Sequence, residues 1–274
     1  MFNDISDQVR RLDREKAPDF AFLMVGGNPG GFFSIIENCV YQQDRDKDYG
    51  PEYPDPEGEC YKALRRARQN IRSPWFINGI WNSVYAILDE PRIRKNRRFR
   101  LVVVSYAGLF NHDDKRCDDW SFGIWSGKQP KLTTKLRRDI NGVIDDGRSM
   151  YDRLINYIMF NPKVRFIDVN SALDGHRFCE NTTEGSFESQ NANSWLWNLE
   201  WPGCLPLVPH SDSRPDKFTV QWGLCRKCGA IGQLGELQRP FHPKAEGFAA
   251  IEVLLKKELQ EEFAGIYPGI GMAN

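Results

Sequence analysis

Two short motifs contain residue types that could perform chemistry, and the first is Gly-Gly-Asn-Pro-Gly-Gly at residues 26–31. It directly follows an apolar run at residues 20–25. Glycines at such a point let the main chain approach a ligand closely, and the amide of Asn28 can donate a hydrogen bond to a developing oxyanion. The spacing fits neither a Walker phosphate loop nor a dinucleotide fingerprint. The alternative is a glycine-rich turn in which Asn28 merely tolerates a left-handed conformation.

The second motif contains His242, within the stretch Pro-Phe-His-Pro-Lys-Ala-Glu-Gly at residues 240–247. Pro243 and the Lys-Ala-Glu that follows it favour the start of a helix. A histidine at the junction between a loop and a helix can be aimed at a site as a general base. The alternative is a structural or exposed histidine without a chemical role.

Strands that alternate with helices must position these motifs. Short apolar runs predict buried strands at residues 20–25, 99–105 and 164–169. Near-continuous β-branched residues in the second run indicate a strand covered on both faces, as in parallel sheets. The sequence therefore predicts an α/β fold with a parallel sheet, whose ligands bind beyond the carboxyl ends of the strands.

The helices are predicted from apolar spacing. One covers about residues 61–88 with an interruption at Pro74, and another covers residues 132–158, where Gly142 and Gly147 weaken its continuity. The last covers about residues 244–263, and its apolar stripe contains Phe248, Ile251, Leu255 and Leu259.

The composition excludes several classes of protein. The chain has 274 residues, with 37 basic residues against 37 acidic ones, so it lacks the overall charge of a nucleic-acid binder. No apolar run approaches the ~20 residues that span a bilayer. Residues 1–20 contain no apolar core or cleavage site, so we expect no signal peptide in this chain. Seven cysteines and an Asn181-Thr182-Thr183 sequon nevertheless favour an oxidising, secreted context.

With these motifs in place, the chain resembles the SGNH (GDSL-type) hydrolases, and most closely their secreted esterase and lipase branch of fungi and actinobacteria. Residues 20–28 resemble the family block that has Gly-x-Asn-Asp after a strand. Four further stretches resemble later parts of that branch: residues 31–41, 104–111, 175–180 and 241–247. The resemblance covers residues 5–262 in order.

The resemblance implies a three-layer α/β/α fold and one domain over residues 1–274, with an irregular cysteine- and tryptophan-rich excursion at residues 175–240. It implies hydrolysis of a carboxylic ester or lipid by a serine nucleophile and a histidine base, without a cofactor or a metal. Asn28 would be an oxyanion-hole donor and His242 the general base. It also implies an extracellular, monomeric protein that does not bind nucleic acid, with disulfides Cys39–Cys60 and Cys117–Cys179.

The sequence departs from the family pattern at three points. Pro29 replaces the aspartate that follows the asparagine, and Arg239 replaces the acidic residue three positions before the base. The nucleophile block Gly-Asp-Ser is absent. We therefore expect an N-terminally incomplete domain without the first two strands of the family sheet, and little activity from this chain alone. The alternative function is that of a catalytically inactive remnant or binding protein with an SGNH-like fold.

Other candidate residues have simpler explanations. Ser105 ends a strand but lacks the flanking glycines of a nucleophile elbow, so we do not expect it to replace the missing serine. His176 and Arg177 are expected to pack around Cys179 rather than to line the site. The charged run at residues 92–100 is expected to solvate a helix-to-strand connection.

Two further groups of residues could form ligand sites. A zinc site is a less favoured alternative to a disulfide for the set Cys204, His210, Cys225 and Cys228. The tryptophans could bind an acyl chain or a sugar, although a packing cluster is the simpler interpretation of Trp195, Trp197 and Trp201.

Overall fold

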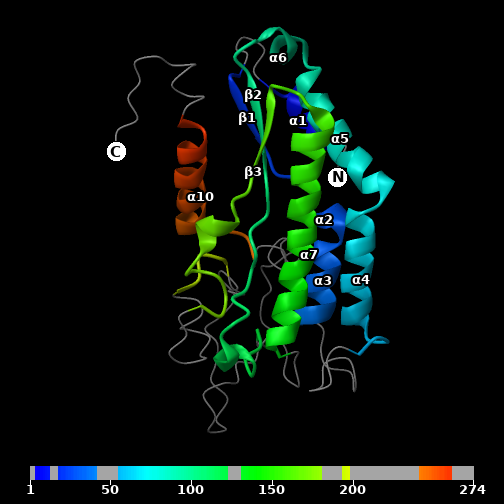
Figure 1. Ribbon diagram of the computed structural model, residues 1–274, viewed down its shortest axis with the longest axis vertical. Coiled ribbons are helices and arrows are strands. Elements are labelled where there is room, and N and C mark those ends of the chain that lie inside the picture. The colour runs from blue at the N-terminus through cyan, green and yellow to red at the C-terminus, as the bar shows by residue number, and fades with distance from the viewer. Residues whose placement is uncertain are drawn as a thin grey trace, which may run out of the picture.

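A parallel sheet lies at the centre of the molecule (Figure 1). The computed structural model describes residues 4–12, 18–41, 55–122, 131–180, 193–197 and 241–260. Its strands, in the spatial order β1-β2-β3, are β1 (Phe20–Leu23), β2 (Arg100–Val104) and β3 (Val164–Ile167). β2 pairs in parallel with both neighbours. The predicted α/β fold with a parallel sheet is confirmed.

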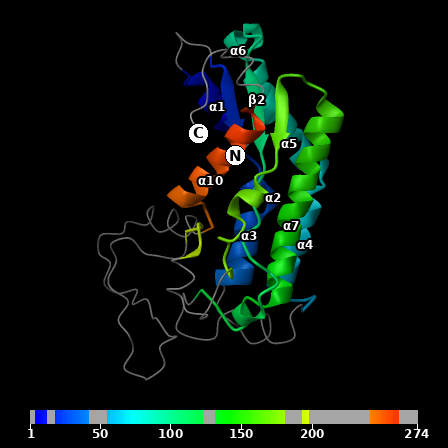
Figure 2. The same ribbon diagram turned by 60° about the vertical axis from the view of Figure 1, so that its left-hand side comes forward.

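Helices cover both faces of the sheet (Figures 1 and 2). One face packs against α1 (Asp4–Arg10), α4 (Glu59–Ile71), α5 (Pro74–Leu88) and α7 (Thr134–Asp152). The other face packs against α10 (Ala245–Glu258). β2 supplies both cores, because Leu101 and Val103 face the first group of helices while Val102 and Val104 face α10. This produces three layers.

Short elements connect these layers. Between β1 and α4 lie α2 (Gly27–Gly30), α3 (Phe32–Ile36) and the π-helical turn η1 (Glu37–Tyr41). The others are α6 (Pro91–Lys95), the 3₁₀ turn η2 (Lys115–Cys117), the π-helical η3 (Arg153–Met159) and the 3₁₀ turn η4 (Asn170–Leu173).

The predicted interruption at Pro74 is confirmed. Ser73 precedes α5, and its hydroxyl accepts a hydrogen bond from the main-chain N–H of Phe76 at 3.2 Å. Pro74 then occupies the first turn, where its missing N–H leaves no bond unmade. In contrast, α7 runs without a break through Gly142 and Gly147, because its buried stripe and the packing of α4 against it outweigh the cost of two glycines.

The predicted apolar stripe of α10 is wrong at one position. Ile251 and Leu259 are buried as expected, but Phe248 is 57% exposed and Gly247 takes the buried position. A Cβ atom on Gly247 would lie 2.8 Å from the carbonyl oxygen of Trp195. The main chain of α10 therefore approaches the neighbouring segment directly at Gly247, and this contact turns Phe248 toward solvent.

β1 occupies an edge of the sheet in the part of the chain that the structure describes. Phe22 pairs with Val102, which places its side chain on the α10 face, yet Phe22 is 54% exposed and Met24 is 44% exposed. α10 thus covers β2 and β3 but leaves β1 open on that face. Among the described helices, none is long and apolar enough to cross a membrane.

Candidate functional site

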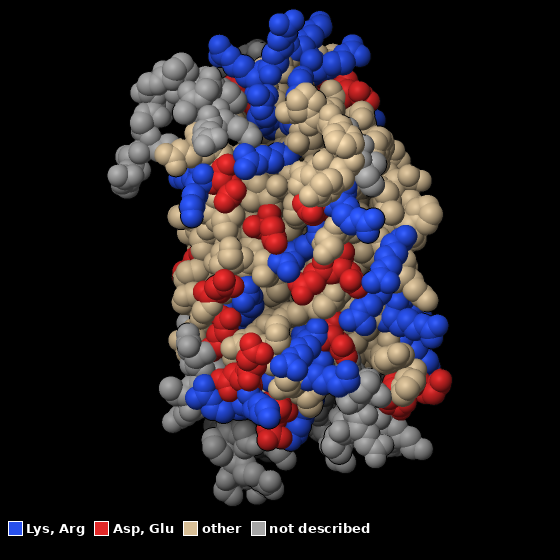
Figure 3. Space-filling model, viewed as in Figure 1, with Lys and Arg blue, Asp and Glu red and all other residues tan. Residues whose placement is uncertain are grey.

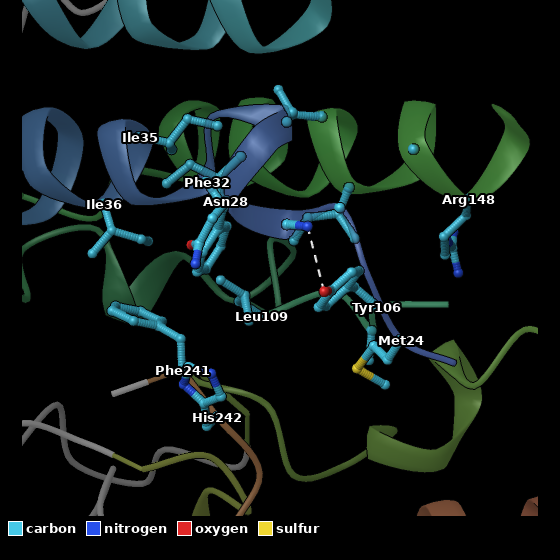
Figure 4. A pocket seen from close by; sticks show the side chains of 18 of the residues that line it. Met24, Asn28, Phe32, Ile35, Ile36, Tyr106, Leu109, Arg148, Phe241 and His242 are labelled. Carbon is cyan, nitrogen blue, oxygen red and sulfur yellow. Dashed lines mark hydrogen bonds between the residues drawn. The ribbon is translucent and has the colours of Figure 1, made fainter. Parts of the chain in front are cut away.

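A pocket of about 240 Å³ opens at the carboxyl ends of the strands, and both predicted site residues line it (Figure 4). Asn28 follows β1 and His242 precedes α10, and they lie on different sides of the pocket. Most of the remaining lining is apolar, including Met24, Phe32, Ile36, Leu109, Leu173 and Ile251. The fold therefore brings together an amide and an imidazole from the two ends of the sequence, beside a surface that suits a hydrocarbon chain.

Glycines, not Asn28, adopt the left-handed conformations in the first motif. Gly26 has a φ of 105° and Gly31 a φ of 101°, and the four residues between them form the helical turn α2. Asn28 lies inside that turn and is exposed. The alternative interpretation, in which Asn28 tolerates a left-handed turn, is therefore wrong. The two glycines reverse the chain so that the Asn28 side chain reaches the pocket.

Two tyrosines hold this loop in place. The main-chain N–H of Gly27 donates to the Tyr106 hydroxyl at 3.3 Å, and the Tyr151 hydroxyl donates to the carbonyl of Val25. Burial raises the pKa of both tyrosines, and the nearby Tyr106 raises that of Tyr151 further. Both hydroxyls therefore remain protonated at neutral pH. Sequence reasoning missed this pair, and its only signal is that Tyr106 follows the end of a buried strand.

His242 is positioned through its main chain. Its carbonyl accepts a hydrogen bond from the N–H of Trp197 at 2.8 Å, and the N–H of Phe241 donates to the carbonyl of Trp197 at 2.9 Å. The imidazole itself is exposed and forms no hydrogen bond with the part of the chain that the structure describes. The ring is thus available to a ligand in the pocket.

The residue before His242 is a buried anchor. Phe241 has a φ of 71°, a region that a bulky side chain rarely adopts, and it is only 6% exposed. Its ring packs edge to face against Phe122 at 5.2 Å and Phe178 at 5.6 Å. This aromatic packing compensates for the backbone strain and fixes the direction in which the next residue, His242, leaves the core.

The aromatic packing around Phe241 is connected to a disulfide. Phe178 precedes Cys179, which is bonded to Cys117, as the sequence resemblance implied. The other implied disulfide, Cys39–Cys60, joins η1 to α4 on the first-motif side of the pocket. Both predicted disulfides are confirmed.

Ser105 is not available as a nucleophile. It is fully buried, its hydroxyl donates to the Asp168 carboxylate at 2.8 Å, and it accepts from the N–H of Val169 at 2.9 Å. Asp168 also pairs with Arg148 at 3.1 Å. Among the described residues that line the pocket there is no serine, threonine, cysteine or carboxylate side chain.

His176 packs as expected. Its ring stacks on Trp195 with the centroids 3.6 Å apart, and Nδ1 lies 3.1 Å from the carbonyl of Asn193. Arg177 pairs with Asp174 and Glu180.

Several candidates lie outside the described residues: Asn181, Trp201, Cys204, His210, Cys225, Cys228, Arg239 and most of the excursion at 175–240. Within the described ranges, no three histidine, cysteine, aspartate or glutamate side chains form a group that could hold a metal ion.

Comparison with solved structures shows that this fold is similar to that of a lipase. The structure is similar to the extracellular lipase of Streptomyces rimosus, with a TM-score of 0.53 and 15% identity over 92% of this chain and 76% of the lipase. It is also matched to phospholipase A1 of Streptomyces albidoflavus, with a TM-score of 0.47 and 18% identity over 85% of this chain and 75% of that enzyme. Neither a protein-family model nor a curated protein matches the sequence. The chain therefore shares the fold of the lipase at low sequence identity.

Proposed function

We propose that this chain is a carboxylic ester hydrolase of the esterase and lipase type, built as one SGNH-type domain over residues 1–274. The observation that carries the proposal is that Asn28 and His242, selected from separate motifs, line one apolar pocket. The shared fold with an extracellular lipase supports a lipid or ester substrate. That likeness and the two disulfides support an extracellular location.

The proposed chemistry assigns one step to each part of the pocket. The acyl chain of the ester lies against the apolar lining, which includes Leu109 and Ile251. His242 removes a proton as the nucleophile attacks the carbonyl carbon, and the side-chain amide of Asn28 donates a hydrogen bond to the oxyanion that forms. The protonated His242 then gives its proton to the departing alcohol as the bond between the carbonyl carbon and the alcohol oxygen breaks, and the acyl group stays bonded to the nucleophile.

The nucleophile is the part of the proposal that the described lining does not supply. The family resemblance implies a serine, and none lines the pocket among the described residues. A water molecule deprotonated by His242 can attack the ester, but without a covalent intermediate the reaction is slower. We therefore expect low turnover from the 274-residue chain.

Hydrolysis of p-nitrophenyl butyrate tests the proposal, with the spontaneous rate in buffer as the reference. The wild-type chain should exceed that rate, and both His242→Ala and Asn28→Ala should remove the excess. His112→Ala is a matched control, because His112 is 41% exposed and lies outside the pocket lining. Equal rates for the wild type and all three variants would contradict the proposal.

The alternative function is that of a binding protein that does not hydrolyse its ligand. The absence of a serine, threonine or cysteine side chain from the described lining favours it. It predicts that a fluorescent long-chain fatty acid binds the wild type and His242→Ala equally well, while neither hydrolyses an ester. A His242-dependent rate would exclude this alternative.

A further inference from the structure

The end of the molecule opposite the pocket carries a dense group of cations. Arg94 and Lys95 close α6, and Arg97 and Arg98 lie in the turn that leads to β2. All four side chains are exposed, and none forms an ion pair within the described residues. Figure 3 shows Lys and Arg gathered at the end where Figure 1 labels α6. Since the whole chain is neutral, this local charge is a property of one surface.

Two of the acidic groups near these cations have other partners. Glu90 caps the start of α6 and pairs with Arg92 at 2.7 Å. Asp19 accepts a hydrogen bond from the side chain of Asn96 at 2.9 Å. Within the described residues, none of the four exposed cations forms an ion pair with Asp19, Asp89 or Glu90.

The main chain beneath the cations is fixed. The ammonium group of Lys163 donates to the carbonyls of Ile93, Arg94 and Asn96 at 3.0, 3.1 and 2.9 Å. Phe99 is fully buried. The charged side chains thus project from a rigid base, which limits the entropy that the main chain would lose on binding a partner.

Two exposed aromatic residues lie just before the same lysine. Tyr157 is 66% exposed and Phe160 is 78% exposed. Phe160 has a φ of 43°, so a bulky residue occupies the left-handed region without being held there by burial of its ring. Because Lys163 binds the carbonyls of α6, the turn that bears Phe160 lies beside the cations.

We propose that this basic and aromatic surface, formed by Arg94, Lys95, Arg97, Arg98 and Phe160, docks on an anionic lipid bilayer. Arginine and lysine bind the phosphate and carboxylate groups of anionic lipids through charge-assisted hydrogen bonds. Exposed aromatic rings enter the boundary between head groups and acyl chains. The neutral charge of the whole chain disfavours a nucleic acid as the partner.

Docking by this surface has a geometric consequence. The cations lie at the amino ends of β2 and β3, whereas the pocket lies beyond the carboxyl ends of the strands. The bilayer would therefore hold the protein with its pocket facing away from the membrane. The proposal is independent of ester hydrolysis and describes a tether, not a substrate interface.

Vesicle binding tests the proposal through a quadruple variant. Wild-type protein should bind phosphatidylcholine vesicles that contain phosphatidylserine, and should bind pure phosphatidylcholine vesicles much more weakly. Replacing Arg94, Lys95, Arg97 and Arg98 with Gln should lower the partition coefficient at least about a hundredfold, since each cation contributes roughly fivefold. The matched control replaces Arg65, Arg66, Lys115 and Lys257, which are also exposed and form no ion pair with other described residues.

The control has the same net charge as the quadruple variant, so it separates a local surface from overall charge. It should retain most of the wild-type binding. Equal losses in the two quadruple variants, or equal binding to both kinds of vesicle, would overturn the proposal. So would tighter binding to a single-stranded oligonucleotide than to the anionic vesicles in the same buffer.

Phe160→Gly provides a second test that does not depend on charge. Glycine adopts a φ of 43° without strain, so this variant should unfold at a higher temperature than the wild type. It should nevertheless bind the anionic vesicles about tenfold less, because the inserted ring is lost. A variant with higher stability and unchanged vesicle binding would show that the ring has no part in docking.

Discussion

The main-chain N–H of Gly27 donates a hydrogen bond to the Tyr106 hydroxyl, with 3.3 Å between nitrogen and oxygen. This bond joins the segment after β2 to the loop after β1, one residue before Asn28. Tyr106 and Asn28 both line the pocket (Figure 4). The position of the proposed oxyanion donor therefore depends on a side chain from the neighbouring strand.

Removal of that hydroxyl should loosen the loop. We expect Tyr106→Phe to lower the free energy of unfolding by about 0.5–1.5 kcal/mol, because the Gly27 N–H loses its acceptor. It should also reduce any Asn28-dependent ester hydrolysis. Urea denaturation and the ester assay measure the two effects. The control is Tyr85→Phe, since the Tyr85 hydroxyl has no hydrogen bond among the described residues; a similar change in both variants would contradict the assigned role.

Gly26 should not tolerate a side chain. A Cβ atom there would clash with the Tyr151 hydroxyl, and its φ of 105° adds strain for any other residue. Gly26→Ala should therefore destabilise the protein by about 2 kcal/mol or more. Gly147→Ala is the opposite case, because its Cβ atom would approach nothing closer than 4.0 Å within α7, and it should stabilise by about 0.5–1 kcal/mol. Thermal unfolding of the pair measures this contrast.

Acid should weaken the link between Asp118 and Arg137. Burial tends to raise the pKa of Asp118, but hydrogen bonds from Thr134 and Arg137 and the guanidinium charge hold it below the ordinary value of 3.8. The folded chain thus binds this proton less readily than the unfolded chain. The stabilisation is fully present above the unfolded-state pKa and is lost as the pH falls through the folded-state pKa.

Asp118→Asn tests this linkage. The Arg137 side chain is fully buried and lies 2.6 Å from Asp118, so the variant should lose about 2–3 kcal/mol near neutral pH, allowing for the partial exposure of the carboxylate. The loss should shrink below the unfolded-state pKa. Asp119→Asn, which removes an 89% exposed partner of Lys131, should cost less than about 1 kcal/mol. If the free energies of unfolding of the wild type and Asp118→Asn differed by the same amount at every pH, the linkage would be refuted.

The two disulfides should differ in their effect. Cys117–Cys179 closes 62 residues and Cys39–Cys60 closes 21. The chain-entropy estimate gives the longer loop about 1 kcal/mol more stabilisation. Loss of the longer one should also release Phe178 from Phe241 and lower any His242-dependent activity. Denaturation of the two double-alanine variants compares the free energy of unfolding that each disulfide contributes, and the ester assay compares their activities. Equal losses of stability and activity would contradict the role of Phe178 and Phe241 in positioning His242.

Local patterns predicted most of the frame. β2 is recognisable in the sequence from its near-continuous β-branched residues, and the structure covers them on both faces. Ser73-Pro74 specifies the start of α5 through its own local bonds. The three-layer arrangement was implied by the family resemblance and is present in the structure. The co-location of Asn28 and His242 is observed, while their chemical roles remain a proposal.

The contacts that position the site could not be read from the sequence. The bonds from Gly27 to Tyr106 and from Tyr151 to Val25 connect residues 79 and 126 positions apart, and no local period encodes such distances. The predicted burial of Phe248 was wrong for the same reason, because the approach of Gly247 to Trp195 sets the rotation of α10. The short helix α6 was not predicted, because it lies in a charged run and Glu90 and Pro91 start it without an apolar stripe.

The central place of β2 also bears on how the chain is made. β2 pairs with β1, which precedes it in the sequence, and with β3, which a ribosome would add only after all of α7. Until β3 emerges, one hydrogen-bonding edge of β2, the most buried of the described strands, stays open, and α10 is not yet present to cover its second face. Such an interval favours pairing with another nascent chain. We therefore expect the yield of folded protein to depend on chaperones that shield β2 during synthesis.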